Sequence, residues 1–228
     1  MPDLVEYHII TQEEGIPPFQ AHLYDYLFAG NGVFIRSKRQ GLEVILPVVM
    51  REIRGLARVE PLVRFTHPPV PEHLVDQMLW CAQGALGEGG NPVEILFHLE
   101  WRDEGWHLTI PEQEQTATSV VPTDDSAGSS YATALIDLHS HHGMRAFFSA
   151  TDNRDEQGFR IYAVLGNIFK RPELLVRVGC EGIHWIIPAT TVFELPEGLI
   201  DASVPLPDQD EDDDFQQESD EGEEAPQL

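Results

Sequence analysis

The chain has 228 residues, a formal net charge of −25 and two cysteines, Cys81 and Cys180. This length holds one medium domain or two small ones, and a hydrophobic fraction of 42% permits a buried core. Two cysteines far apart in sequence do not indicate a disulfide scaffold, no N-terminal segment has signal-peptide character, and no apolar run is long enough to span a bilayer. We therefore expect a soluble cytoplasmic protein.

The N-terminal region, residues 1–67, is predicted to be a small α+β unit. Residues 23–28 favour a short helix, and the segments 33–36 and 42–49 favour a β-hairpin. Three prolines in the stretch 66–74 then interrupt the pattern and predict a domain boundary.

The second region, residues 68–200, places one helix before several strands. The helix is predicted to begin at Pro71, because proline is tolerated in the first turn of a helix. Its apolar residues lie on one helical face: Leu74, Val75, Met78, Leu79 and Ala82. The expected strands cover 93–99, 106–110, 131–141, 159–165, 174–180 and 183–188, and a polar loop covers 112–130. This order predicts a mixed α/β domain with a largely antiparallel sheet flanked by helices.

The C-terminal segment, residues 201–228, is predicted to be a disordered acidic tail. It contains a run of Asp and Glu with no Lys or Arg, and such a segment repels itself and cannot bury enough apolar surface to fold. The tail either aids solubility or binds a basic partner or surface. The rest of the chain is still acidic without it, so we expect no direct nucleic-acid binding.

Two histidines and an aspartate in the second region have the spacing of a metal site. Side chains two apart on a strand share a face, so His139 and His141 point the same way. Asp137 shares this face, and we expect it as an outer-shell partner of a ligand. Ser149 and Asp152 are three residues apart and share a face of a helical turn. If that turn folds back over the strand end, Asp152 meets the histidines. Three such ligands leave a fourth position open, as in catalytic zinc sites.

The order His139, Ser140, His141, Ser149 and Asp152 resembles the JAMM motif of the JAB/MPN metalloprotease family. The resemblance covers roughly residues 68–199 and implies a cytidine-deaminase-type α/β domain. It implies that His139, His141 and Asp152 bind Zn²⁺, which lowers the pKa of a water molecule. The implied reaction is hydrolysis of a peptide or isopeptide bond.

The same resemblance implies two catalytic residues. Glu94 fits the glutamate that the family carries on an earlier strand, as general base and then acid, and Ser149 would donate a hydrogen bond to the oxyanion. Other readings stay open: Glu94 as an ordinary strand residue with Glu100 as the rival base, and Ser149 as a helix N-cap. His142 stands where the family commonly has proline. We expect it to face solvent, the alternative being a role in binding substrate or a second ion.

A narrower resemblance suggests partners. The proline-punctuated N-terminal region, the stretch TDNRDEQGFRIYAVLG at 151–166 and the overall length are similar to the PRTRC system protein A group. This resemblance implies a cassette that also encodes ThiF-like activating and ParB-related proteins. A ThiF-like enzyme in turn implies a ubiquitin-like protein as a possible substrate.

Three functions remain in view. The first is a zinc metallopeptidase that acts at the tail of a ubiquitin-like protein, which the complete motif favours. The second is a non-catalytic MPN-type scaffold, and the third is a hydrolase of small peptide or amino-acid conjugates. The sequence does not separate the first from the third, because substrate grooves are built from loops.

Overall fold

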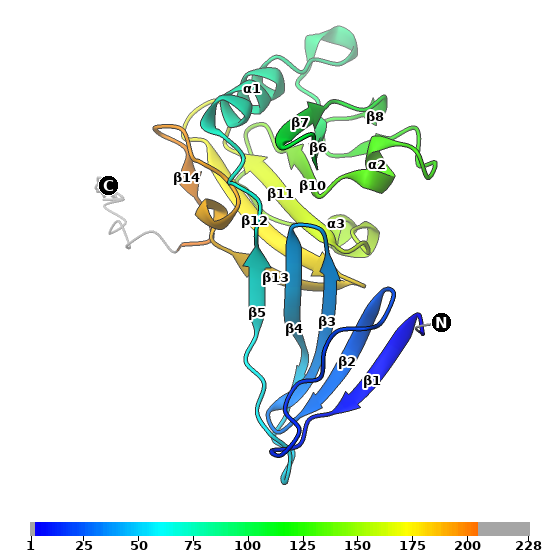
Figure 1. The fold of residues 1–228 in the computed structure, drawn as a ribbon. Coiled ribbons are helices and arrows are strands. Elements are labelled where there is room, and N and C mark those ends of the chain that lie inside the picture. Colours follow the sequence, from blue (N-terminus) through cyan, green and yellow to red (C-terminus); the bar gives the residue numbers. More distant parts are fainter. Residues whose placement is uncertain (1–2, 205–228) are drawn as a thin grey trace, which may run out of the picture.

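The computed structural model describes residues 3–204, which form two large β-sheets, a separate two-stranded sheet and a few short helices (Figure 1). The N-terminal sheet has the strand order β1-β2-β3-β4-β5, with β1 parallel to β2 and the other pairs antiparallel. Its strands are β1 (Val5–Ile9), β2 (Tyr24–Ala29), β3 (Gly32–Arg39), β4 (Leu42–Met50) and β5 (Leu62–Phe65).

The second sheet has the order β13-β12-β11-β10-β6-β7, with β14 paired to β12. Its strands are β6 (Leu96–Arg102), β7 (Gly105–Thr109), β10 (Ile136–Ser140), β11 (Arg160–Gly166), β12 (Glu173–Cys180), β13 (Ile183–Ile187) and β14 (Ile200–Asp201). β10 is parallel to β11 and β12 to β14, and the remaining pairs are antiparallel. The prediction of a mixed, largely antiparallel α/β domain is confirmed.

Helices and one separate hairpin surround this second sheet. The hairpin consists of β8 (Gln113–Gln115) and β9 (Val120–Pro122). The helices are α1 (Glu72–Gln83), α2 (Ser130–Thr133) and α3 (Ala150–Asp155), with single 3₁₀ turns at Glu88–Gly90 and Ala189–Thr191. The α1 face that the sequence predicts is the buried one, with Val75, Met78 and Ala82 in the core. None of the helices in residues 3–204 is long and apolar enough to span a membrane.

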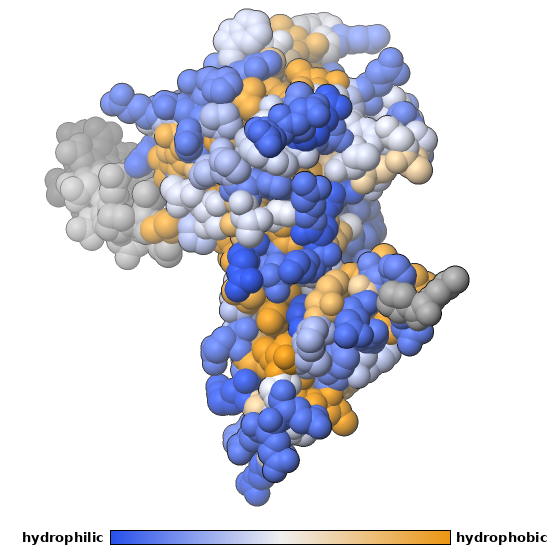
Figure 2. All heavy atoms as spheres, viewed as in Figure 1, coloured by the Kyte–Doolittle hydropathy of each residue, from blue (hydrophilic) through white to orange (hydrophobic). Residues whose placement is uncertain are grey.

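The two sheets share one apolar core. Ile35, Leu42 and Val44 of the N-terminal sheet belong to the same buried cluster as Phe97 and Leu138 of the second sheet. A smaller cluster lies within the N-terminal sheet. Apolar side chains also show on the surface of this lower part of the molecule (Figure 2), where Ile9, Val49 and Met50 are exposed.

Two sequence predictions of local structure are wrong. The sequence predicts a helix over 23–28, but residues 24–28 belong to strand β2, which is paired on both sides and buries every second residue. The strand expected over 131–141 begins only at Ile136. Ser129 caps the short helix α2 before it, accepting a hydrogen bond from the backbone N–H of Ala132 at 3.3 Å.

The acidic tail predicted at 201–228 lies outside the described residues except for 201–204. Within that short part, Asp201 is the last residue of β14. Its Oδ2 accepts a hydrogen bond from the backbone N–H of Ala189 at 2.7 Å. The described chain is therefore anchored as far as Asp201.

Candidate metal centre

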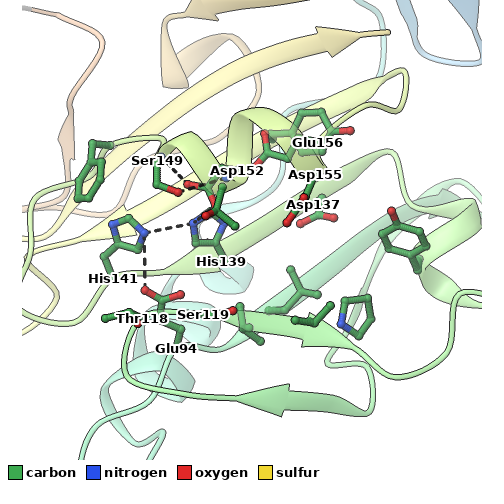
Figure 3. Close-up of a pocket in the computed structure, with 18 of the residues that line it drawn as sticks. Glu94, Thr118, Ser119, Asp137, His139, His141, Ser149, Asp152, Asp155 and Glu156 are labelled. Atoms are coloured by element: carbon green, nitrogen blue, oxygen red, sulfur yellow. Dashed lines mark hydrogen bonds and ion pairs between the residues drawn. The ribbon is translucent and has the colours of Figure 1, made fainter. Parts of the chain in front are cut away.

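Strand β10 and the residue directly after it bring two histidines to one point. β10 lies between β6 and β11 and ends at Ser140, and His139 and His141 turn to one face while the fully buried Ser140 turns to the other. The hydroxyl of Ser140 accepts a hydrogen bond from the backbone N–H of Ile95 at 3.2 Å. The Nε2 atoms of His139 and His141 are 3.3 Å apart (Figure 3). The sheet thus holds two imidazole nitrogens together on a rigid strand end.

Helix α3 brings a carboxylate to the same point. Ser149 is its N-cap and forms a capping box with Asp152: Ser149 Oγ accepts from the Asp152 N–H at 3.1 Å, and the Ser149 N–H donates to Asp152 Oδ2 at 2.5 Å. Oδ1 of Asp152 lies 3.9 Å from Nε2 of His139. The local turn therefore uses one carboxylate oxygen and leaves the other facing the histidines, and potential ligand atoms of the three residues lie within 4.8 Å of one another.

The loop after β10 orients His141. Nδ1 of His141 lies 3.4 Å from the backbone oxygen of Arg145, so an N–H at Nδ1 leaves the lone pair at Nε2. This loop is held down: the Ala146 N–H donates to Glu173 at 3.1 Å. It also passes so close to Gly166 of β11 that a Cβ there would come within 2.1 Å of Ala146 N. A glycine is needed at this approach.

The protonation states suit metal ligands. Burial lowers the pKa of His139 to about 4 and also lowers the pKa of His141, so both imidazoles are neutral near pH 7. Burial opposes ionisation of Asp152, but His139 and the hydrogen bonds from Ser149 outweigh it and lower the pKa of that carboxyl. Neutral imidazoles and an ionised carboxylate are the forms that bind metal.

Glu94 lies on the other side of His141. It is 3% exposed and precedes β6, with Oε1 3.7 Å from His141 Nε2. The β8–β9 hairpin fixes its backbone, since Glu94 N–H donates to the oxygen of Thr116 at 2.8 Å and the Glu94 oxygen accepts from Gln115 at 2.7 Å. Burial, with a contribution from Asp152, raises the pKa of Glu94 to about 8. Glu94 is thus a buried carboxyl beside the histidines.

The rival base lies elsewhere. Glu100 accepts a hydrogen bond from Thr133 and is 3.6 Å from Arg102. It is absent from the residues that line the pocket around the histidines. The structure brings Glu94, and not Glu100, to the candidate site.

Two neighbours of the site differ from expectation. Asp137, expected as a partner of a ligand, instead faces His98 Nε2 and Arg160 Nη1, both 3.8 Å from its Oδ2. These two side chains come from the strands on either side of β10, which the sequence alone does not pair. His142, expected to face solvent, is 8% exposed, because the chain at Ile168 folds over it and donates to its carbonyl at 2.9 Å.

The histidines, Asp152 and Glu94 lie at one end of a pocket of about 490 Å³. One wall is the segment 118–122 of the β8–β9 hairpin, and the other is formed by β10 and α3 (Figure 3). Phe147 packs against the His141 ring, with ring centroids 4.7 Å apart, and Tyr131 also lines the pocket. Sequence reasoning missed this wall and Phe147. The paired phenylalanines before Ser149 were the one signal available.

A second cluster of histidine and carboxylates lies in the N-terminal sheet. His8 Nε2 is 3.3 Å from Glu6 Oε2 and 3.3 Å from Asp25 Oδ2. Asp25 is already paired with the buried Arg36, whose Nε donates to Oδ1 at 3.0 Å and whose Nη2 donates to Oδ2. A cation already neutralises this carboxylate, so we read the cluster as an ion-pair network that joins β1, β2 and β3.

Comparison with known proteins identifies the segment that carries the site. Residues 78–179 match the family described as prokaryotic homologs of the JAB domain. The match includes Glu94, His139, His141, Ser149 and Asp152. No curated protein matches the chain. The grouping with PRTRC system protein A is not tested by this match and stays a prediction.

Proposed function

We propose that the chain is a zinc-dependent metallopeptidase of the JAB/MPN family that hydrolyses a peptide or isopeptide bond, and the match of residues 78–179 to prokaryotic homologs of the JAB domain supports this proposal. The observation that carries the proposal is the meeting of His139, His141 and Asp152 at the end of a pocket, with the buried Glu94 beside them.

The three ligand residues fit a zinc ion. Zinc takes imidazole nitrogen and carboxylate oxygen at about 2.0–2.2 Å, which sets tetrahedral ligand atoms roughly 3.3–3.6 Å apart. The observed separations are 3.3 Å between the two Nε2 atoms and 3.9 Å from His139 Nε2 to Asp152 Oδ1. Three protein ligands leave one position open. Zinc, when bound, supplies a Lewis acid that lowers the pKa of water toward neutrality.

Glu94 is the proton carrier in this proposal. Its carboxyl group is buried at the pocket end and 3.7 Å from His141 Nε2. The positive charge of a bound zinc ion would favour the ionised form of Glu94 against the effect of burial. The ionised carboxylate would take the proton of the attacking water and later pass it to the leaving amine. The two hydrogen bonds from the β8–β9 hairpin to the Glu94 backbone keep the carboxyl group in place during both proton transfers.

Ser149 stabilises the oxyanion. Its hydroxyl oxygen accepts from the Asp152 N–H, and its hydroxyl group also forms a side-chain hydrogen bond that lowers the pKa of the Asp152 carboxyl. In this proposal the hydroxyl hydrogen turns from that carboxylate to the oxygen on which negative charge develops during attack. One residue therefore serves both as helix cap and as oxyanion donor, so the N-cap reading and the catalytic reading are compatible.

The test combines metal content with turnover. We expect about one zinc per chain in protein purified without chelator, and loss of that zinc in His141→Ala. Hydrolysis is then assayed on ubiquitin-like proteins that carry a C-terminal extension or isopeptide conjugate, and on short peptides. Turnover of the protein conjugates supports a ubiquitin-like substrate, and turnover of peptides alone supports small conjugates.

Two results would contradict the proposal. Folded protein that neither contains zinc nor takes it up would remove the metal site. Zinc-loaded protein that cleaves none of these substrates would favour the scaffold reading, in which the JAB domain acts through contacts with other proteins.

A further inference from the structure

Helix α3 carries one proposed zinc ligand and is not held by apolar packing. It has six residues, and none of them is buried. A helix this short is not stable by itself in water, so contacts with the rest of the protein must keep it in place. Its capping box orders the first turn but does not attach the helix to the sheet.

One side chain from the sheet supplies that attachment. Arg177 of β12 is 3% exposed, and its guanidinium makes three hydrogen bonds to the α3 segment. Nε and Nη2 donate to Glu156 Oε2 at 2.9 and 2.5 Å, and Nη1 donates to Asn153 Oδ1 at 2.5 Å. The guanidinium carbon also lies 3.8 Å from the centre of the Phe148 ring.

These contacts span the whole helix. Phe148 comes just before the N-cap, Asn153 lies in the middle, and Glu156 is the C-cap. Arg177 itself is fixed, because β12 pairs with β11 on one side and β13 on the other at this position. A smaller contact comes from His184 of β13, whose Nε2 is 2.9 Å from the backbone oxygen of Glu156.

We propose that Arg177 is a positioning residue, which holds α3 on the sheet so that Asp152 meets His139 and His141. The inference rests on the proposed zinc site. Asp152 is the neighbour of Asn153, so a helix that rotates or lifts from Arg177 carries its carboxylate away from the histidines. Zinc and Arg177 then hold α3 from two sides, and each favours the same docked position.

The chemistry of arginine explains why this residue type is needed. A planar guanidinium can reach two acceptors and stack on a ring at once, and an ammonium cannot. Burial raises the pKa of Glu156, and Arg177 opposes that shift. Loss of Arg177 leaves a buried carboxyl without its partner, which weakens the docking of α3 further.

The test uses Arg177→Gln, Arg177→Lys and a matched control. The control is Arg36→Gln, since Arg36 is also a buried arginine in two-point contact with a carboxylate, Asp25, but in the N-terminal sheet. Two quantities are measured on the full chain. The first is amide hydrogen exchange of residues 148–157 in metal-free protein, and the second is zinc affinity by competition with a chelator.

Arg177→Gln is expected to speed exchange in 148–157 and to weaken zinc binding about 10–100-fold, the usual effect of losing a group that supports a ligand. Arg177→Lys keeps the charge and is expected to fall between wild type and Arg177→Gln. Arg36→Gln is expected to leave unchanged the exchange of 148–157 and the zinc affinity of the site at His139, His141 and Asp152, even if it lowers the melting temperature by a similar amount.

Unchanged exchange and unchanged zinc affinity in Arg177→Gln would overturn the inference, and so would equal effects in Arg36→Gln. If Arg177→Gln does not fold, the milder Arg177→Lys decides by the same two measurements. Wild-type protein that binds no zinc contradicts the proposed function instead, and exchange in the metal-free protein still shows whether Arg177 holds α3.

Discussion

The molecule contains two clusters of histidine and carboxylate whose ligand atoms are similarly close. In one, His139, His141 and Asp152 meet at the end of a pocket. In the other, Glu6, His8 and Asp25 meet on the N-terminal sheet. The spacing of donor atoms alone does not distinguish them.

What surrounds the carboxylates does distinguish them. Arg36 occupies both oxygens of Asp25, whereas Asp152 gives one oxygen to its own helix cap and turns the other to the histidines. The two arginines at α3 are both engaged by other carboxylates, Arg177 by Glu156 and Arg154 by Asp155. A metal site requires donors whose charge is not already balanced, a condition that Asp152 meets and Asp25 does not.

The largest effect is expected at Glu94, the buried carboxyl that only the first cluster has beside it. Glu94→Gln removes the proton carrier and is expected to lower kcat by about 10²–10⁴-fold. Zinc content should stay near one per chain, because no ligand is changed. Steady-state kinetics with elemental analysis checks both values. Glu100→Gln is the control, and full activity in Glu94→Gln would show that another group is the base.

A somewhat smaller loss of rate is expected at Ser149. Ser149→Ala removes an oxyanion donor, which costs roughly 10²–10³-fold in kcat, and it also removes a helix cap worth about 1 kcal/mol. Ser149→Thr retains a hydroxyl group and should recover much of both losses. Comparison of kcat and melting temperature in the two variants separates the roles, and a drop in stability without a drop in kcat would leave Ser149 as a cap alone.

The third prediction concerns Asp152 and zinc affinity. Asp152→Asn removes the only charged ligand of the first cluster, so chelator competition should show weakening by at least about 10–100-fold. Asp155→Asn changes a neighbouring exposed carboxylate on the same helix and should leave the affinity near that of wild type. An unchanged zinc affinity in Asp152→Asn would remove this residue from the ligand set.

The smallest effect is expected in the second cluster. His8→Ala should leave zinc stoichiometry unchanged and lower the free energy of unfolding by about 1 kcal/mol or less, the range of partly exposed ion pairs. Elemental analysis and thermal unfolding measure the two quantities. A loss of one zinc from a two-zinc protein would show that the ion-pair reading of Glu6, His8 and Asp25 is wrong.

Local sequence patterns predicted the fold where the spacing of apolar residues clearly matched either a helix or a strand. The spacing of Val75, Met78 and Ala82 fits only a helix, and α1 is there. The stretch 23–28 is too short for the helical period of 3.6 residues to be told from the strand period of 2. Pairing with β1 and β3 makes most of it a strand. The short strands β1, β5 and β14 carry no strong pattern and form because neighbouring strands offer hydrogen bonds.

In the candidate site, too, local patterns predicted some features, and contacts between distant segments determined the others. Strand alternation and a spacing of three placed His139, His141 and Asp152 correctly toward one another, and Glu94 followed from the family resemblance. The partners of Asp137 were missed because they are His98 and Arg160, which reach it from adjacent strands. Arg177 was missed for a similar reason, since nothing in the sequence near β12 indicates that it faces a helix formed some twenty residues earlier.

The loop at Ala146 passes so close to Gly166 that only the hydrogen atom of a glycine fits there. This approach affects where His141 carries its proton. Any side chain at position 166 would push away the backbone that presents the Arg145 oxygen. That oxygen decides which nitrogen of His141 carries the proton. We therefore expect Gly166→Ala, at the end of β11, to change the tautomer of the His141 imidazole. The nitrogen chemical shifts of His141 would show this change while the strand keeps its register.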